Sequence, residues 1–222
     1  MNFLSSIFSI KKVPYLSWSS EHPLNKRPKA FTVIMLVIGL FLFGLGEAIL
    51  IASDSGVSPW TVLAQGISKM TNVSIGEATF LISISILLFW IPLRQIPGIG
   101  TILNVIIIAS AIDLTLPYLP HPENFLLKIL QASLGILVVG IGSGIYLSCN
   151  LGPGPRDGLM VGLQQITNKS IPTIRTFIEL SAVISGWLLG GIVGVGTILF
   201  VFGIGPCVGM GLTLVEKLSR EA

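Results

Sequence analysis

Residues 56–76 read GVSPWTVLAQGISKMTNVSIG, and they align without a gap with residues 152–172, which read GPGPRDGLMVGLQQITNKSIP. The alignment continues to Leu103 and Leu199, and 17 of its 48 positions are identical. Apolar composition alone produces chance matches of Leu and Ile, but it does not produce Pro, Gly, Thr, Asn and Ser matches in the same order. The chain therefore contains an internal duplication with a shift of 96 residues.

The composition indicates an integral membrane protein that contacts the lipid bilayer. The chain has 222 residues, of which 52% are hydrophobic and 10% charged, and its mean hydropathy is +0.88. A soluble globule of this size needs more polar side chains than that to cover its surface. The net charge of +3 comes from Lys and Arg scattered over loops and ends, with no basic helix and no interleaved aromatic residues, so we expect no nucleic-acid partner.

We expect no enzyme activity, cofactor or metal. The two cysteines are not spaced as CxxC, and the two histidines lie in loops beside prolines. Motifs of metalloproteases, P-loop NTPases and α/β-hydrolases do not occur in the sequence.

Six stretches are long and apolar enough to cross a membrane, since a span needs about 20 residues. Three belong to repeat 1 (31–118) and three to repeat 2 (126–215), and the six ranges are 31–52, 76–93, 98–117, 126–148, 173–190 and 194–215. The fold class predicted is an all-α integral membrane protein with one membrane domain. An N-terminal segment (1–30) and a short tail (216–222) lie outside the spans.

The distribution of basic residues predicts the orientation. With six spans and a cytoplasmic N-terminus, only Lys69 and Lys128 of the thirteen Lys and Arg residues fall outside. We therefore expect a multi-pass protein of the inner membrane with both termini cytoplasmic. Each copy carries three spans, so the second copy starts on the opposite face, and the two repeats have inverted topology. Such repeats recur in transporters and channels, with the solute site near the midplane between them.

A short helix is predicted after the first span of each copy, at 59–70 and 155–166. Ser58 and Gly154 are suitable N-caps, and Pro59 and Pro155 are suitable first helical residues. Twelve helical residues measure about 18 Å, which is roughly half a bilayer. Each short helix is either re-entrant, with its N-terminus near the bilayer centre, or interfacial, with Trp60 as an anchor.

Polar and charged residues near these short helices are the candidate solute-binding residues, because such groups at membrane depth are costly and usually functional. Glu47 is the strongest candidate for lining a path, and Arg156 is either an anion contact or a cytoplasmic charge that sets the orientation. The full set is Glu47, Asp54, Ser58, Trp60, Thr61, Gln65, Asn150, Gly154, Arg156 and Asp157.

Three other acidic residues have structural interpretations. Arg175 and Glu179 are four residues apart on one helix face, which predicts a structural ion pair. Ser74 and Glu77 form the sequence pattern of a capping box. Asp113 is expected at the membrane boundary.

The segments GLGEAIL (44–50), GVSPWTVLAQGIS (56–68) and TNVSIGEATF (71–80) resemble the bacterial YczE/YitT-type membrane proteins. The resemblance covers roughly residues 31–215 and implies the fold of a small polytopic inner-membrane protein, without implying a substrate. Thr61 stands where that pattern usually has Asp, while Asp157 occupies the matching place in the second copy.

The inverted duplication favours a small transporter or permease, which moves a small anionic or polar solute through a site between the repeats. A passive channel is one alternative. Another is a membrane subunit that does not transport, either a substrate-binding component or an assembly scaffold. A homodimer is compatible with the small size of the chain.

Overall fold

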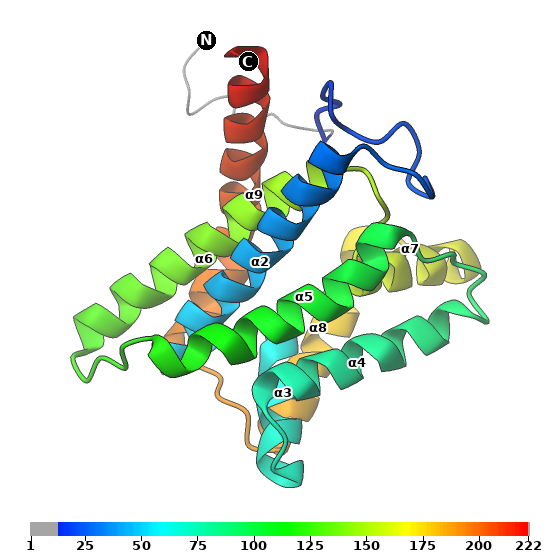
Figure 1. The fold of residues 1–222 in the computed structure, drawn as a ribbon. Coiled ribbons are helices and arrows are strands. Elements are labelled where there is room, and N and C mark those ends of the chain that lie inside the picture. The colour runs from blue at the N-terminus through cyan, green and yellow to red at the C-terminus, as the bar shows by residue number, and fades with distance from the viewer. Residues whose placement is uncertain (1–12, 222) are drawn as a thin grey trace.

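The computed structural model describes residues 13–221, so the first part of the predicted N-terminal segment lies outside the described residues. Within this range the chain is entirely helical, with no strand (Figure 1). Repeat 1 forms α2 (Ala30–Ala52), α3 (Pro59–Thr71), α4 (Ile75–Trp90) and α5 (Ile99–Thr115), which continues into the 3-10 turn η1 (Leu116–Tyr118). Repeat 2 forms α6 (Phe125–Ser148), α7 (Pro155–Thr167), α8 (Ile171–Leu188) and α9 (Val195–Glu221).

Every predicted range contains one α-helix, and the largest differences from the prediction are at the ends of α4 and α9. The second predicted span extends to residue 93, whereas α4 ends at Trp90, since the chain turns at residues 91–94. Pro92 cannot continue a helix without losing a backbone hydrogen bond. The last helix is longer than predicted and continues from the membrane range into the tail.

Four helices are long and apolar enough to span a membrane, namely α2, α5 with η1, α6 and α9. A fifth span results if α3 and α4, which are bent by 113° at their junction, are counted as one broken span. The start of α2 and the end of α9 lie at the same end of the molecule (Figure 1). The chain is thus an all-helical membrane protein with four or five candidate spans.

Equivalent positions of the two copies have the same backbone conformation. Asp54 and Asn150 both have positive φ, at 50° and 51°, and Gly56 and Gly152 have φ of 108° and 110°. These angles lie in the left-handed region, where Gly is unstrained and Asn and Asp are enriched. The turns before α3 and α7 are therefore the same turn built twice.

The two copies are interlocked rather than placed side by side. The backbone N–H of Gly100 in repeat 1 donates to the carbonyl of Leu151 in repeat 2, at 2.7 Å. The equivalent Gly196 donates to Ser55 of repeat 1, at 2.8 Å. Each extended segment before a short helix is consequently held by the last long helix of the other copy.

The first helices of the two copies, α2 and α6, pack in opposite directions through paired glycines. A Cβ at Gly46 would lie 2.7 Å from the carbonyl oxygen of Gly135, and a Cβ at Gly142 would lie 2.7 Å from that of Gly39. Gly39 is equivalent to Gly135, and Gly46 to Gly142, so the contact repeats itself across an approximate twofold axis. Only glycine permits this approach of the two backbones.

The short helices also pack across the copies, α3 against α8 and α7 against α4. Trp90 of α4 covers Gly158 of α7, and its indole N–H donates to the carbonyl of Pro155 at 3.0 Å. At the equivalent contact, Gly186 of α8 lies against the backbone at Val62 of α3. The large and small partners are exchanged between the copies, which keeps both contacts close-packed.

The start of α4 is anchored by three side chains. The predicted capping box is confirmed, because the Ser74 hydroxyl accepts from the Glu77 N–H and the Glu77 carboxylate accepts from the Ser74 N–H. Asp113 of α5 accepts hydrogen bonds from the Ser74 hydroxyl at 2.5 Å and from the Gly76 N–H at 2.8 Å. Asp113 therefore joins α5 to the first turn of α4.

Candidate functional site

The N-termini of α3 and α7 meet inside the protein. Trp60 and Arg156 are equivalent positions of the two copies, each the second residue of its short helix. The guanidinium carbon of Arg156 lies 5.1 Å from the centre of the Trp60 ring, which is a cation–π contact. Because of this contact, the N-termini of α3 and α7 lie at the same site.

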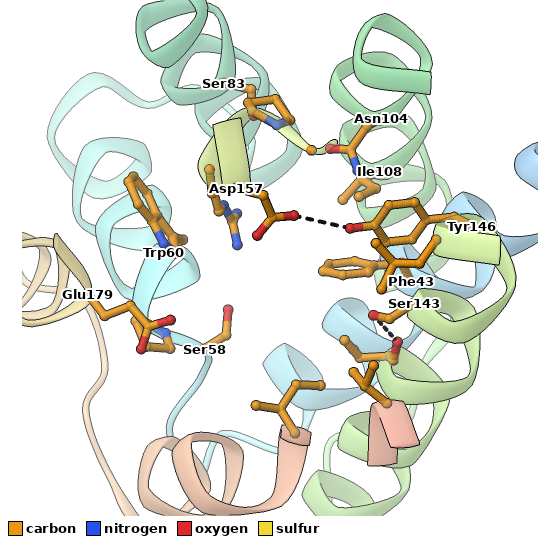
Figure 2. A pocket seen from close by; sticks show the side chains of 18 of the residues that line it. Phe43, Ser58, Trp60, Ser83, Asn104, Ile108, Ser143, Tyr146, Asp157 and Glu179 are labelled. Carbon is orange, nitrogen blue, oxygen red and sulfur yellow. Dashed lines mark hydrogen bonds between the residues drawn. The ribbon is translucent and has the colours of Figure 1, made fainter. Parts of the chain in front are cut away.

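This site surrounds a cavity of about 240 Å³. The short helices contribute Ser58, Trp60, Gly154, Arg156 and Asp157, while the longer helices contribute the polar side chains Thr79, Ser83, Asn104, Ser143, Tyr146, Arg175 and Glu179 (Figure 2). A water molecule occupies about 30 Å³ in the liquid, so the cavity has room for about eight waters. That volume fits a solute of amino-acid size.

Arg156 is the principal cation of the cavity. Its guanidinium makes no hydrogen bond or ion pair with any residue between 13 and 221, although the charges of Glu47, Asp157 and Glu179 act on it from nearby. A guanidinium carries five N–H donors, and leaving them unpaired away from bulk water is costly. Arg156 therefore lines the cavity with N–H donors that have no partner among residues 13–221.

Glu47 lies behind the cavity wall and does not line it, contrary to our prediction. Its side chain is 1% exposed, and its Oε2 accepts from the hydroxyls of Ser58 at 2.9 Å and Thr61 at 2.8 Å. Among the described residues its Oε1 has no hydrogen-bond partner. Ser58 lines the cavity and separates the carboxylate from it, so Glu47 reaches the site only through that hydroxyl.

Asp157 is the carboxylate at the start of α7. Its Oδ2 accepts from the Tyr146 hydroxyl at 3.4 Å, and the side chain lines the cavity (Figure 2). Thr61 is the equivalent of Asp157, and Ser143 is the equivalent of Glu47. Each short helix therefore has one carboxylate at its N-terminus, which α2 supplies in repeat 1 and α7 itself supplies in repeat 2. A negative charge at this end stabilises a helix.

The predicted ion pair between Arg175 and Glu179 is confirmed, with 2.9 Å between Nε and Oε1. The sequence did not predict where this ion pair lies, and in the structure both residues line the cavity. Their equivalents in repeat 1 are Thr79 and Ser83, which line it too. The two copies thus present a charged pair and a hydroxyl pair to the same space.

Besides Glu47 and its partner Thr61, three predicted binding residues do not line the cavity and instead fix connecting segments. Asp54 is exposed and forms an ion pair with Lys128 at 3.2 Å. Asn150 donates to the carbonyl of Ser20 at 2.8 Å, and Gln65 accepts from a backbone N–H just before α9 at 3.0 Å. The last two side chains satisfy loop backbone groups, which need a partner when they are buried.

Tyr146, Ser143 and Phe43 line the cavity and were not predicted. Tyr146 lies within the apolar run of α6, and its equivalent in repeat 1 is Leu50, so the duplication gives no signal for it. A tyrosine hydroxyl inside a span is itself a polar group that needs a partner, and this property was the only available clue.

Comparison with known proteins finds relatives that match most of the chain. The family described as "Family of unknown function (DUF6198)" matches residues 30–212. An "Uncharacterized protein" of Haemophilus influenzae is 40% identical over 211 residues, covering 95% of this chain and 96% of its own length. The "Uncharacterized membrane protein YczE" of Bacillus subtilis is 32% identical over 163 residues, covering 72% and 76%. The Bacillus subtilis protein YyaS is 27% identical over 184 residues, covering 81% and 92%. No solved structure matches the chain.

Proposed function

This chain belongs to the DUF6198 family and is a YczE-type membrane protein, and we propose that it is a transporter or permease for a small polar solute. The observation that carries the proposal is the cavity at the two short-helix N-termini, with the Arg156 guanidinium unpaired on its wall. A built site for a solute at the contact between two repeats is typical of secondary transporters.

The chemistry of the cavity supports solute binding rather than packing. Two helix N-termini bring unsatisfied N–H groups and positive partial charge to the same space. The wall adds hydroxyl, amide, guanidinium and carboxylate groups from both copies. A cavity that served only to join helices would gain more from apolar side chains, because buried polar groups cost free energy unless they are paired.

In the proposed membrane arrangement, α2, α4, α5, α6, α8 and α9 are six spans with inverted topology, and α3 and α7 are re-entrant. The antiparallel α2 and α6 support the inversion, since a twofold axis between two antiparallel spans lies in the membrane plane. The first residues of α3 support re-entry, because Trp60 and Thr61 are buried while Lys69 and Met70 are exposed. We place the termini in the cytoplasm and the protein in the inner membrane on the distribution of its basic residues.

Gly154 offers a direct test of the transport path. A Cβ added there would meet no atom closer than 3.4 Å, the nearest atoms being polar groups of Asp157, Asn104 and Tyr146. Gly154→Leu therefore fills the cavity without a backbone clash. The matched control is Gly205→Leu in α9, where a Cβ would meet nothing within 4 Å and the residue is exposed.

The experiment measures solute entry into proteoliposomes that contain the purified protein, with a panel of small anions, amino acids, nucleobases and vitamins. We expect at least one solute to enter in a protein-dependent manner, with entry blocked by Gly154→Leu and retained by Gly205→Leu. Entry that collapses with the proton gradient identifies a coupled transporter. If no solute enters, or if both variants behave alike, the proposed path is wrong.

A further inference from the structure

The charges around the cavity nearly cancel. Two guanidinium groups, those of Arg156 and Arg175, face the carboxylates of Asp157 and Glu179, and the buried Glu47 lies one side chain further away. The excess of one carboxylate is offset by the N-termini of α3 and α7, each equivalent to about half a positive charge. The site as a whole is therefore close to neutral.

A site that is nearly neutral gives no net electrostatic attraction to a solute with a net charge. A bare anion or a bare cation would leave one uncompensated charge in the cavity, which is strongly unfavourable away from water. A solute without net charge avoids this cost. Charged groups at both of its ends would still gain from the charged groups on the wall.

The Arg156 guanidinium supplies unpaired donors to the cavity wall. It makes no hydrogen bond among the described residues and lies over the Trp60 ring, 5.1 Å from its centre. A guanidinium only donates, and a carboxylate is the group that accepts from it in a bidentate arrangement.

Two carboxylates supply acceptor atoms to the same space. Glu179 uses Oε1 for its bond to Arg175, and Asp157 accepts from the Tyr146 hydroxyl at 3.4 Å and from the backbone N–H of Gly154. Figure 2 shows Trp60 and Glu179 on one side of the open space and Tyr146 on the other, with Asp157 directed toward Tyr146. A carboxylate has two oxygens with about four lone-pair sites, so both side chains have acceptor capacity left for an ammonium group.

We propose that the cavity binds a small zwitterion, with its carboxylate at Arg156 and its ammonium group at the carboxylates of Asp157 and Glu179. This inference rests on the proposed function, because it names the class of solute for the same cavity. The cavity volume of about 240 Å³ has room for a solute of amino-acid size.

The test compares each zwitterion with a carboxylate and an amine that carry only one of its two charged groups. Three sets are used: glycine, acetate and methylamine; alanine, propionate and ethylamine; and glycine betaine, acetate and tetramethylammonium. The measurement is the Tm of the detergent-purified full chain with each probe. At a hundredfold excess over Kd, a binding probe should raise Tm by about 5 °C or more. We expect a zwitterion to do so, and its matched carboxylate and amine to have little effect.

Two variants reverse the preference if the inference is correct. Arg156→Gln should weaken zwitterion binding roughly 30-fold or more and make the matched amine the better ligand. Asp157→Asn should shift the preference toward the matched carboxylate. A variant that gains a new ligand has kept its fold, so loss of folding cannot imitate this result. Arg94→Gln and Asp54→Asn are the matched controls, since both residues are exposed and neither lines the cavity.

The outcomes separate this inference from the proposed function. If propionate or ethylamine stabilises the wild type as well as alanine does, or if no probe stabilises it, the zwitterion inference is overturned. Solute entry that Gly154→Leu blocks would in that case still support transport. Conversely, stabilisation by a zwitterion without any entry would support the inference and refute transport.

Discussion

Glu47 is expected to be one of the most important polar residues for stability. Its Oε2 accepts hydrogen bonds of 2.9 and 2.8 Å from Ser58 and Thr61 in a site that is 1% exposed. A hydrogen bond to a charged group is worth about 1.5–3 kcal/mol, so two bonds amount to about 3–6 kcal/mol. Ser58 and Thr61 also lie 2.9 Å from each other, so in Glu47→Ala they retain one bond. We therefore expect a loss of about 3 kcal/mol in that variant.

Glu47→Gln separates the hydrogen bonds from the charge. The glutamine carbonyl accepts from both hydroxyls, and its amide replaces Oε1, which has no partner among the described residues. We expect this variant to lose about 1–2 kcal/mol, because its two bonds go to a neutral acceptor and its amide N–H groups take the place of a buried oxygen that has no partner among the described residues.

The exchange of carboxylates between the copies predicts a rescue. The double variant Glu47→Ser, Thr61→Asp builds into repeat 1 the arrangement of repeat 2, where Ser143 and Asp157 occupy the equivalent positions. It returns a negative charge to the start of α3. We expect it to recover at least half of the stability that Glu47→Ser alone loses.

These variants are compared by thermal unfolding of the detergent-purified protein. For 150–250 residues, 1 kcal/mol corresponds to about 2–4 °C, so Glu47→Ala should lower Tm by roughly 6–12 °C. Glu123→Ala, at an exposed loop position, is the control and should leave Tm nearly unchanged. The reasoning is refuted if Glu47→Ala and Glu47→Gln have the same Tm, or if Thr61→Asp adds no stability to Glu47→Ser.

Three further predictions concern packing and surface charge, and each is measured as a change in Tm. Gly142→Ala should destabilise the protein by about 1–3 kcal/mol, because its Cβ would press on the backbone of α2. Gly203→Ala in α9, whose Cβ would meet no atom closer than 3.5 Å, should have no cost and gain up to about 1 kcal/mol of helix propensity. Equal effects would contradict the close contact of α2 and α6. Trp90→Phe should cost about 1 kcal/mol, since it removes the indole N–H that donates to the carbonyl of Pro155 while that carbonyl keeps its intrahelical bond, and an unchanged Tm would argue against the indole bond. Lys128→Ala should cost less than about 1 kcal/mol, because its partner Asp54 is exposed, and a larger loss would show that the pair does more than join two loops.

Residues of the cavity were predictable where the duplication pointed to them. Ser58, Gly154, Arg156 and Asp157 stand at the starts of two helices with the same proline, and the pattern of a cap followed by proline is local. Asp54 and Asn150 belong to the same pattern and were predicted wrongly, because local sequence does not show which side of a turn faces a cavity.

Other features of the site depend on contacts between distant residues. Tyr146 meets Asp157 across two helices, and Arg156 meets Trp60 from the other copy, 96 residues away along the chain. Neither contact leaves a periodic signal, since periodicity reports only which face of one helix is buried. The similar placement of Glu47 and Asp157 was not predicted for the same reason. The carboxylate belongs to α2 in repeat 1 and to α7 in repeat 2, so the two residues are not at equivalent positions of the sequence, although each lies beside the start of a short helix.

The sequence by itself determined the membrane class, the helices and the duplication, because composition, caps and prolines act within a few residues. Only the tertiary structure decided that the two short helices meet at one cavity and that Glu47 lies behind the cavity wall. The near cancellation of the charges around the cavity was also decided there. Those properties follow from how α2 and α6 approach through their glycines and from how each short helix packs against the other copy. Packing between distant segments sets them, and no local stretch of sequence encodes that packing.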